Sequence, residues 1–111
     1  MIPVTTTDTG VIVSELITGI DLAKEQIRVA AGYTLSFKQE DIVLRGHSFE
    51  CRIYAEDPLN NFIPDYGRLT AYRSATGNGI RLDGGTAYAG GVITRYYDSL
   101  LVKVTAHAQT P

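Results

Sequence analysis

Residues 45–58, RGHSFECRIYAEDP, constrain the fold most, because apolar and polar side chains alternate through them. One set is small or apolar: Phe49, Cys51, Ile53 and Ala55. The other set is polar: Glu50, Arg52 and Tyr54. A period of two places the sets on opposite faces of a β-strand, so we expect the apolar face in the core. Asp57-Pro58 should end the strand, because proline cannot donate to a ladder. The polar face is then either an edge facing water or the floor of a site.

The chain has 111 residues, of which 44% are hydrophobic and 20% charged, with both signs interspersed. This length suits one small domain that buries about two thirds of its unfolded surface. A formal net charge of −2 argues against a nucleic-acid binder held by phosphate contacts. No apolar run approaches the roughly 18 residues of a membrane span. The N-terminus lacks the features of a signal peptide, and a single cysteine fits a reducing compartment. We therefore expect the cytoplasm, or an organelle matrix after import.

One helix is expected over residues 14–32. Apolar residues recur there at spacings of four and three and form a single stripe: Leu16, Ile20, Ala23, Ile27 and Ala30. Thr18 and Asp21 match a capping box with Asp in place of Glu, which indicates a first turn and then a main helix from about Gly19. Gly32 is placed to end the helix in a left-handed cap.

Short strands joined by turns are expected after the helix. Alternation over 68–73, a glycine-rich connection and the short run 80–83 together predict a hairpin. A last strand is expected over 100–107. One helix followed by four or five short strands, without βαβ alternation, predicts an α+β fold with one main helix and a small, mostly antiparallel sheet.

Weaker signals lie on either side of the helix. Residues 1–10 would be an edge strand or a tail, and 11–13 is a β-branched run that indicates a strand fragment. Residues 42–44 would begin a strand, and Gly46 would let the backbone turn or bulge before the alternating stretch.

Metal and nucleophile chemistry find little support. The candidate metal ligands are Cys51, His47 and His107, and their spacing matches no zinc motif. Cys51 also lies on the expected apolar face, so we interpret it as a small core residue. The glycines at 77–79 and 84–85 lack the lysine and the strand-to-helix context of a phosphate loop, so we interpret them as turn residues. We expect no metal site.

Positive charge on strand faces is what remains: Arg52, Arg68, Arg73, Arg81, Arg95 and Lys103. The planar fork of arginine binds carboxylate, carbonate or phosphate through paired hydrogen bonds. Two interpretations of Arg52 beside Glu50 stay open on pattern alone. One is a surface ion pair worth at most about 1 kcal/mol, and the other is a group at a binding site. The pattern favours the ion pair.

Four stretches resemble the biotin carboxylase component of biotin-dependent carboxylases: ITGIDLAKEQIRVAAG (17–32), GHSFECRIYAEDP (46–58), FIPDYGRLTAYRSATGNGIRLDGG (62–85) and VITRYYDSLLVKVTA (92–106). The middle and C-terminal stretches are most similar to pyruvate carboxylases. The helix and the segment SFKQEDIVLRGHSFECRI are closer to acetyl-CoA carboxylases. The resemblance implies the C-terminal domain of that component over residues 14–111, incomplete at its C-terminal end, after a divergent N-terminal segment, 1–13.

The resemblance also implies site residues. In that family an ATP-grasp enzyme makes carboxyphosphate from ATP and bicarbonate and then carboxylates biotin. The arginine of the E-C-R-I-x-A-E-D-P motif lies at the bicarbonate and biotin site, and this role falls on Arg52. Its guanidinium would stabilise the charge that develops on the ureido oxygen of biotin. The family's G-x-G-I/V-R arginine falls on Arg81, near a phosphate site and the dimer contact. Tyr97-Asp98-Ser99 would have a structural role.

The sequence departs from the family before the helix. The family's E-x-N-x-R-x-Q-V-E-H segment carries magnesium-binding and catalytic carboxylates, but the equivalent positions here read TTTDTGVIVS (5–14), with Gly10 at the catalytic glutamate. The ATP-grasp domain and the helices after the last strand are also missing. We therefore expect no cofactor bound by this chain alone, although the parent family uses biotin, ATP and magnesium. We expect the chain to be inactive without the missing ATP-grasp domain.

A function of another class stays open, namely a non-catalytic self-associating or assembly module derived from that domain. Missing neighbours would uncover apolar surface and bare sheet edges, and both promote homo-oligomers. Whether the truncation is natural or engineered also stays open. The acyl acceptor of the parent enzyme is open too, with pyruvate favoured modestly over acetyl-CoA.

Overall fold

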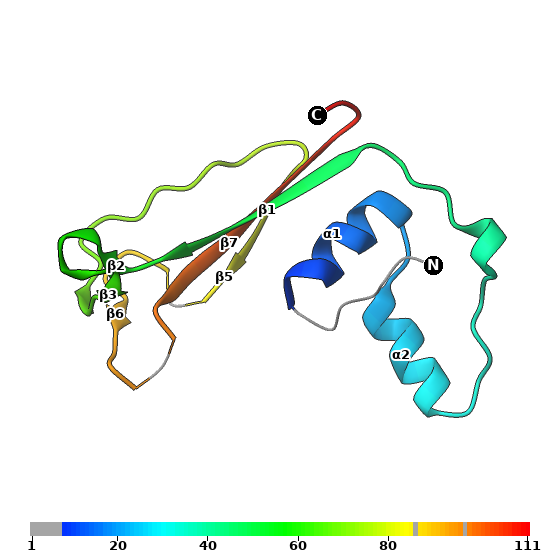
Figure 1. The fold of residues 1–111 in the computed structure, drawn as a ribbon, viewed down its shortest axis with the longest axis horizontal. Helices are drawn as coiled ribbons and strands as arrows, with labels where there is room; N and C mark the ends of the chain where they lie inside the picture. The colour runs from blue at the N-terminus through cyan, green and yellow to red at the C-terminus, as the bar shows by residue number, and fades with distance from the viewer. Residues whose placement is uncertain (1–7, 86, 97) are drawn as a thin grey trace. The chain divides into compact units, whose positions relative to one another are not determined.

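The computed structural model describes residues 8–85, 87–96 and 98–111, and the chain divides into two compact units (Figure 1). The first unit comprises residues 1–49 and 107–111, and the second comprises residues 50–106. The first unit holds the two helices, drawn in blue and cyan in Figure 1. The second holds most of the strand residues. Helices and small antiparallel ladders together confirm the predicted α+β class.

Two helices replace the single helix predicted over 14–32. They are α1 (Asp8–Thr18) and α2 (Leu22–Ala30), and they are separated at Gly19, which has a φ of +73°. The β-branched run 11–13, predicted as a strand, lies inside α1, so that prediction was wrong. Helical context outweighed β-propensity there, because the weak preference of β-branched residues is easily overridden. Most of the predicted segment 1–10 lies outside the described residues.

Local chemistry fixes both ends of α2. Asp21 is the N-cap, and its carboxylate accepts a hydrogen bond of 2.8 Å from the Lys24 amide. The predicted box had placed Thr18 at the cap, but its hydroxyl instead donates to the Ser14 carbonyl at 2.6 Å. At the other end Gly32 has a φ of +90°, and the Tyr33 amide bonds back to the Arg28 carbonyl. This Schellman arrangement confirms the predicted glycine cap.

An extended segment follows α2. Residues 33–46 contain only the short 3₁₀ turn Gln39–Asp41 and no strand, so the strand predicted at 42–44 was wrong. Gly46 has a φ of +70°, as its predicted turning role requires. The first strand begins directly after it.

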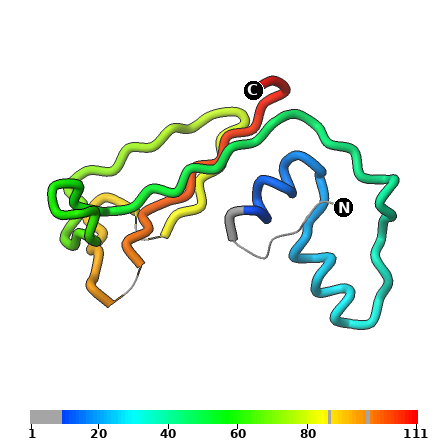
Figure 2. The backbone as a smooth tube through the Cα atoms, in the orientation of Figure 1, coloured from blue at the N-terminus to red at the C-terminus, as the bar shows by residue number. Residues whose placement is uncertain are grey.

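The largest sheet has three strands in the order β1-β7-β5: β1 (His47–Tyr54), β7 (Leu100–Ala108) and β5 (Ile80–Gly84). Strands β5 and β7 pair antiparallel, from Ile80 opposite Ala106 to Gly84 opposite Val102, and they run side by side in Figure 2. The last strand was predicted almost to the residue. It lies in the middle of the sheet.

The predicted hairpin over 68–83 was wrong. The first half of it contributes only β4 (Gly67–Arg68), which pairs with β6 (Val92–Ile93). The second half, β5, pairs with β7 instead. The reason is that β7 offers β5 five consecutive cross-strand partners, and such pairs are the unit of sheet stability. A local glycine turn cannot compete with that ladder.

A second small ladder follows β1. It joins β2 (Glu56–Asp57) to β3 (Ile63–Pro64) across the 3₁₀ turn Pro58–Asn60. The Asp57 carboxylate accepts a 3.0 Å bond from the Leu59 amide and so caps that turn. The Asp57-Pro58 pair therefore ends the extended run, as predicted.

The face of β1 that was predicted to be buried is exposed. Phe49 is 67% exposed and Ile53 43%, and Cys51 is exposed as well. The residues of β1 with intermediate burial are on the opposite face: Ser48, Glu50 and Tyr54. The alternation was therefore correct but its direction was reversed, and the prediction of Cys51 as a core residue was wrong. Burial on a sheet face depends on what covers it, which a period of two does not encode.

The buried hydrophobic residues among those described are few: Ile12, Ile93 and Val102. Three polar residues are buried with them: Ser99, Lys103 and Thr105. In the described part of the chain, no helix is both long and apolar enough to cross a membrane.

Candidate anion site on the sheet

The three-stranded sheet places Arg52 and Arg81 on the same face. The Thr105 hydroxyl lies 3.5 Å from the Glu50 carboxylate, so these side chains share a face. Arg81 is the cross-strand partner of Thr105, and directly opposed residues also share a face. Arg52 follows Glu50 by two residues on β1 and therefore points the same way. The two predicted site arginines thus belong to one polar surface, which we call the arginine face.

Arg81 is already engaged on this face. Its Nε lies 2.9 Å from one carboxylate oxygen of Asp83, and its Nη2 lies 2.9 Å from the other. Both side chains are partly exposed, so this forked pair contributes little to stability. Its main effect is geometric, because it directs the guanidinium along β5.

Arg52 is in a different state. Its side chain is exposed, and its Cζ lies over the Tyr54 ring, 5.6 Å from the centroid. Among the described residues no carboxylate lies within ion-pair distance of it. The surface ion pair with Glu50, which the pattern alone favoured, is therefore not formed. Because the side chain is exposed, its N–H donors are accessible to an oxyanion from solvent.

The other residues of the arginine face are also polar. Thr105 has no exposed surface and Lys103 is 9% exposed, opposite Asp83 in the register. One carboxylate oxygen of Glu50, Oε1, is buried and finds no hydrogen-bond partner among the described residues. An unpaired buried oxygen is costly, so Glu50 is a destabilising group on the arginine face.

The start of β7 is fixed by backbone and side-chain contacts. The Ala55 amide donates to the Ser99 carbonyl at 2.9 Å, and the Asp98 carboxylate accepts from the Leu100 amide at 3.2 Å. Ser99 is 5% exposed. These contacts fit the structural role predicted for this motif, whose Tyr97 lies outside the described residues.

Two further basic residues that the sequence singled out hold loops. Arg68 donates to the Gly90 carbonyl at 2.9 Å, and Arg95 lies over the Tyr66 ring at 5.6 Å. The predicted metal candidates are not brought together. His107 Nε2 lies 3.1 Å from the Arg45 carbonyl oxygen, and no three potential ligands cluster within the ranges that the structure describes.

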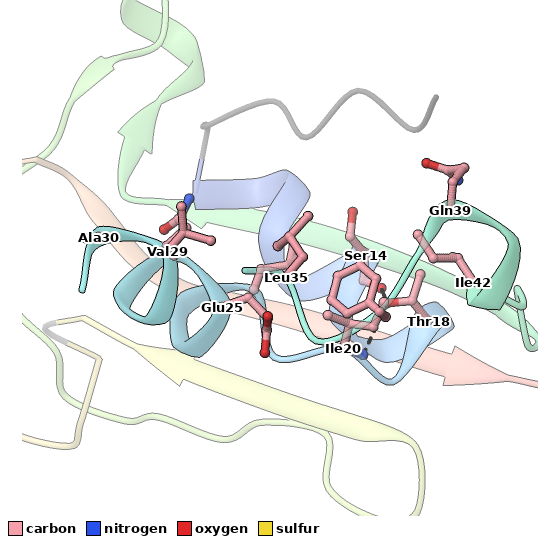
Figure 3. A pocket seen from close by; sticks show the side chains of 12 residues that line it. Ser14, Thr18, Ile20, Glu25, Val29, Ala30, Leu35, Gln39 and Ile42 are labelled. Atoms are coloured by element: carbon pink, nitrogen blue, oxygen red, sulfur yellow. Dashed lines mark hydrogen bonds between the residues drawn. The ribbon is translucent and has the colours of Figure 1, made fainter. Parts of the chain in front are cut away.

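An apolar groove of about 560 Å³ in the first unit was not predicted from the sequence. Figure 3 shows this helix groove, with side chains from α1, α2 and the segment after α2. Its lining is mostly apolar and includes Ile20, Leu22, Val29, Leu35, Phe37 and Ile42. Of the apolar stripe predicted on the helix, only Ile20 and Ala30 line this groove.

Glu25 lies at this groove and links α2 to the segment that follows. The Ser36 hydroxyl donates to Glu25 Oε1 at 2.8 Å, and the Ser36 amide donates to Oε2 at 3.2 Å. These two bonds, helped by the charge of Arg28, lower the pKa of the Glu25 carboxyl from its usual value.

Comparison with known proteins agrees with the implied family. Residues 50–111 match the family described as "Biotin carboxylase C-terminal domain". The chain is 50% identical to the pyruvate carboxylase of Schizosaccharomyces pombe over 101 residues, which are 88% of this chain and 8% of that one. It is 50% identical over 102 residues to the pyruvate carboxylase of Staphylococcus aureus, a match that covers 86% of this chain and 9% of that one.

Solved structures agree with the fold. A Rhizobium etli pyruvate carboxylase has a TM-score of 0.83 at 58% identity, covering 90% of this chain and 10% of that one. The biotin carboxylase domain of the Hydrogenobacter thermophilus 2-oxoglutarate carboxylase has a TM-score of 0.79 at 47% identity. That match covers 88% of this chain and 21% of the other. The chain thus spans a small part of each relative. The prediction that the domain begins at residue 14 stays a prediction. The chain belongs to the biotin carboxylase C-terminal domain family.

Proposed function

We propose that this chain contributes Arg52 to the bicarbonate and biotin site of an ATP-dependent biotin carboxylase. The observation that carries the proposal is the exposed guanidinium of Arg52, which has no carboxylate partner among the described residues and lies in the sequence ECRIYAEDP. The biotin carboxylase domain of the Hydrogenobacter relative was solved with MgADP and bicarbonate, which supports a part for this chain in a bicarbonate-handling enzyme.

The chemistry asked of Arg52 is electrostatic. A guanidinium can donate two parallel hydrogen bonds to bicarbonate and hold it in one orientation. The same group can stabilise negative charge as it develops on the ureido oxygen of biotin, because a fixed positive charge needs no reorganisation during the step. Arg52 would bind and stabilise charge and would transfer no proton, since arginine stays protonated.

Arg81 has a second role in the proposal. Its fork is held by Asp83, so an arriving phosphate or a partner surface must compete with that carboxylate. Because the pair is partly exposed and weak, such competition is feasible. We assign Arg81 to anion or partner contact beside Arg52, with Asp83 limiting its affinity.

The nucleotide and magnesium chemistry must come from elsewhere. No group of three His, Cys, Asp or Glu residues that could hold a metal ion is found within 8–85, 87–96 and 98–111, and the proposal assigns the magnesium ligands to a partner domain. The proposal therefore requires an ATP-grasp partner domain and expects no turnover by this chain alone.

Chemical protection tests the role of Arg52. We expect phenylglyoxal to modify Arg52 faster than Arg81 in the native chain, because the fork of Arg81 is engaged by Asp83. Bicarbonate should slow modification at Arg52 relative to that at Arg95, as mapped by mass spectrometry. An unchanged ratio of Arg52 to Arg95 modification with and without bicarbonate would refute the proposal. In the same samples, biotin-dependent ADP release by the chain alone would contradict the claim of inactivity.

A second candidate function, a self-associating module, is favoured by the amount of exposed apolar surface. Large hydrophobic residues of the second unit are exposed on and after β1, with Leu59 at 97% and Phe62 at 65%. The first unit exposes Ile27 at 71%, and it also holds the apolar helix groove. Apolar surface of this extent marks interaction sites or association liabilities.

A further inference from the structure

Tyr54 lies at the position of the ECRIYAEDP motif for which the family pattern has no fixed residue type. Here that residue is an aromatic ring with the guanidinium of Arg52 over it, at 5.6 Å from Cζ to the centroid. We propose that Tyr54 is a positioning residue: its ring holds the Arg52 guanidinium so that the N–H edge is presented to an incoming oxyanion. This inference rests on the function proposed above for Arg52.

The strand supplies the geometry. Residues two apart on a β-strand project from the same face, so Tyr54 is the neighbour of Arg52 along β1. Tyr54 is half-buried and Arg52 is exposed, so a restrained ring lies beside a side chain that is otherwise free to change rotamer. Arginine has a large rotamer entropy, and a platform that restricts it reduces the entropy lost on binding.

The ring contact of Arg52 and the carboxylate contact of Arg81 differ in whether they occupy the guanidinium N–H donors. A ring engages the flat face of a guanidinium and leaves its N–H groups free. A carboxylate engages the N–H groups themselves, as Asp83 does with Arg81. The arginine face thus contains one arginine held without using its donors and one held through them. Only the first is ready for two parallel bonds to a planar oxyanion such as bicarbonate.

The magnitude follows from the exposure of the contact. Cation–π pairs at exposed sites are weak, and their loss corresponds to about a two- to fivefold change in an equilibrium constant. We expect that factor in bicarbonate affinity when the ring is removed. Tyr54→Phe should retain the affinity, because the phenol oxygen takes no part in the contact.

The experiment is an NMR titration of the complete chain with sodium bicarbonate. The variants are Tyr54→Phe, Tyr54→Leu and Tyr54→Ala, with Arg52→Lys to assign the Arg52 Nε–Hε signal. Leucine retains apolar volume at a half-buried position, so it keeps the test usable if the alanine variant fails to fold. Tyr66→Leu is the matched control, because Tyr66 lies under Arg95 at the same 5.6 Å.

We expect the Hε signal of Arg52 to show an upfield ring-current shift in the native chain and in Tyr54→Phe. Tyr54→Leu should lose that shift and bind bicarbonate about two- to fivefold more weakly, and Tyr66→Leu should change neither. An Arg52 signal that is identical in Tyr54→Leu and the native chain overturns the inference. So does an unchanged bicarbonate affinity in that variant.

The two proposals fail differently. If bicarbonate does not move the Arg52 signal in the native chain, the function proposed for Arg52 is refuted for this chain. The ring-current shift is measured without any ligand, so it still decides whether Tyr54 positions Arg52.

Discussion

Gly46 and Gly19 have nearly the same backbone conformation but different surroundings. Their φ values are +70° and +73°, in the left-handed region that favours glycine. A Cβ at Gly19 would meet nothing within 4 Å. A Cβ at Gly46 would overlap the Ala108 carbonyl oxygen and press on the His107 ring. Backbone strain and steric overlap can therefore be separated within one unit of this protein.

We expect Gly19→Ala to reduce the free energy of unfolding by about 1 kcal/mol, from backbone strain alone. Gly46→Ala should reduce the free energy of unfolding by clearly more, because its Cβ would overlap the Ala108 backbone carbonyl, which cannot rotate away. Urea unfolding followed by circular dichroism measures both variants. Equal losses would contradict the close approach of Ala108 to Gly46.

Single residues also show what the sequence could predict. The cap at Gly32 was correct, because a left-handed glycine after an apolar stripe depends only on its neighbours. The burial of Phe49 was wrong, because it depends on what covers the sheet. Arg52 was identified as a site residue by family resemblance. Only the structure showed that it forms no ion pair with Glu50.

At the scale of elements, α2 is tied to the segment after it by one carboxylate. Glu25 accepts both the hydroxyl and the amide of Ser36, at 2.8 and 3.2 Å, and it also faces Arg28 at 3.5 Å. The pKa of this carboxyl is lowered from 4.5, chiefly by the Ser36 hydroxyl. A lowered pKa in the folded state adds stability above the unfolded pKa of 4.5, and this is lost as the pH falls through the folded value.

Ser36→Ala should raise the pKa of Glu25 toward its ordinary value, because it removes the hydroxyl. The hydrogen bond from the backbone amide of residue 36 to Glu25 should remain. The variant should therefore lose less stability than the native chain on acidification below pH 4.5. Carbon-detected NMR titration of the Glu25 carboxyl gives the pKa directly, and Glu25→Gln identifies the signal. An unchanged titration midpoint in Ser36→Ala would show that the hydroxyl is not responsible.

A helix end and a strand that depend on neighbouring residues were predicted correctly, whereas a pairing between distant segments was not. Strand β7 and the end of α2 follow from short patterns, and both were found. The pairing of β5 with β7 was not predicted, because β7 lies well beyond β5 in the sequence. No local pattern in the loop between them indicates that the two strands pair. The arginine face depends on this pairing, so it could not be derived from spacing alone.

On the scale of the whole molecule, exposed apolar side chains outnumber buried ones. Among the described residues the buried hydrophobic side chains are Ile12, Ile93 and Val102, whereas large hydrophobic side chains of both units are exposed, including Ile27, Leu59 and Phe62. The chain therefore has surface available for a neighbouring domain or a second copy.

We expect the isolated chain to self-associate with rising concentration, because exposed apolar surface has no other cover in dilute buffer. Sedimentation velocity over a range of concentrations measures this. Leu59→Lys and Phe62→Lys should shift the equilibrium toward monomer, and Lys38→Glu is a control at an exposed polar site. A monomer that persists at every concentration would argue against the self-associating module.

The central position of β7 has a consequence for biosynthesis. Thr105 contacts Glu50 across 55 residues of sequence, and β5 also pairs only with β7 in this sheet. A ribosome releases β1 and β5 before the strand that lies between them, so the sheet cannot close until residues 100–108 have left the exit tunnel. Two strand edges stay unpaired through most of translation, when they are open to chaperones and to neighbouring nascent chains.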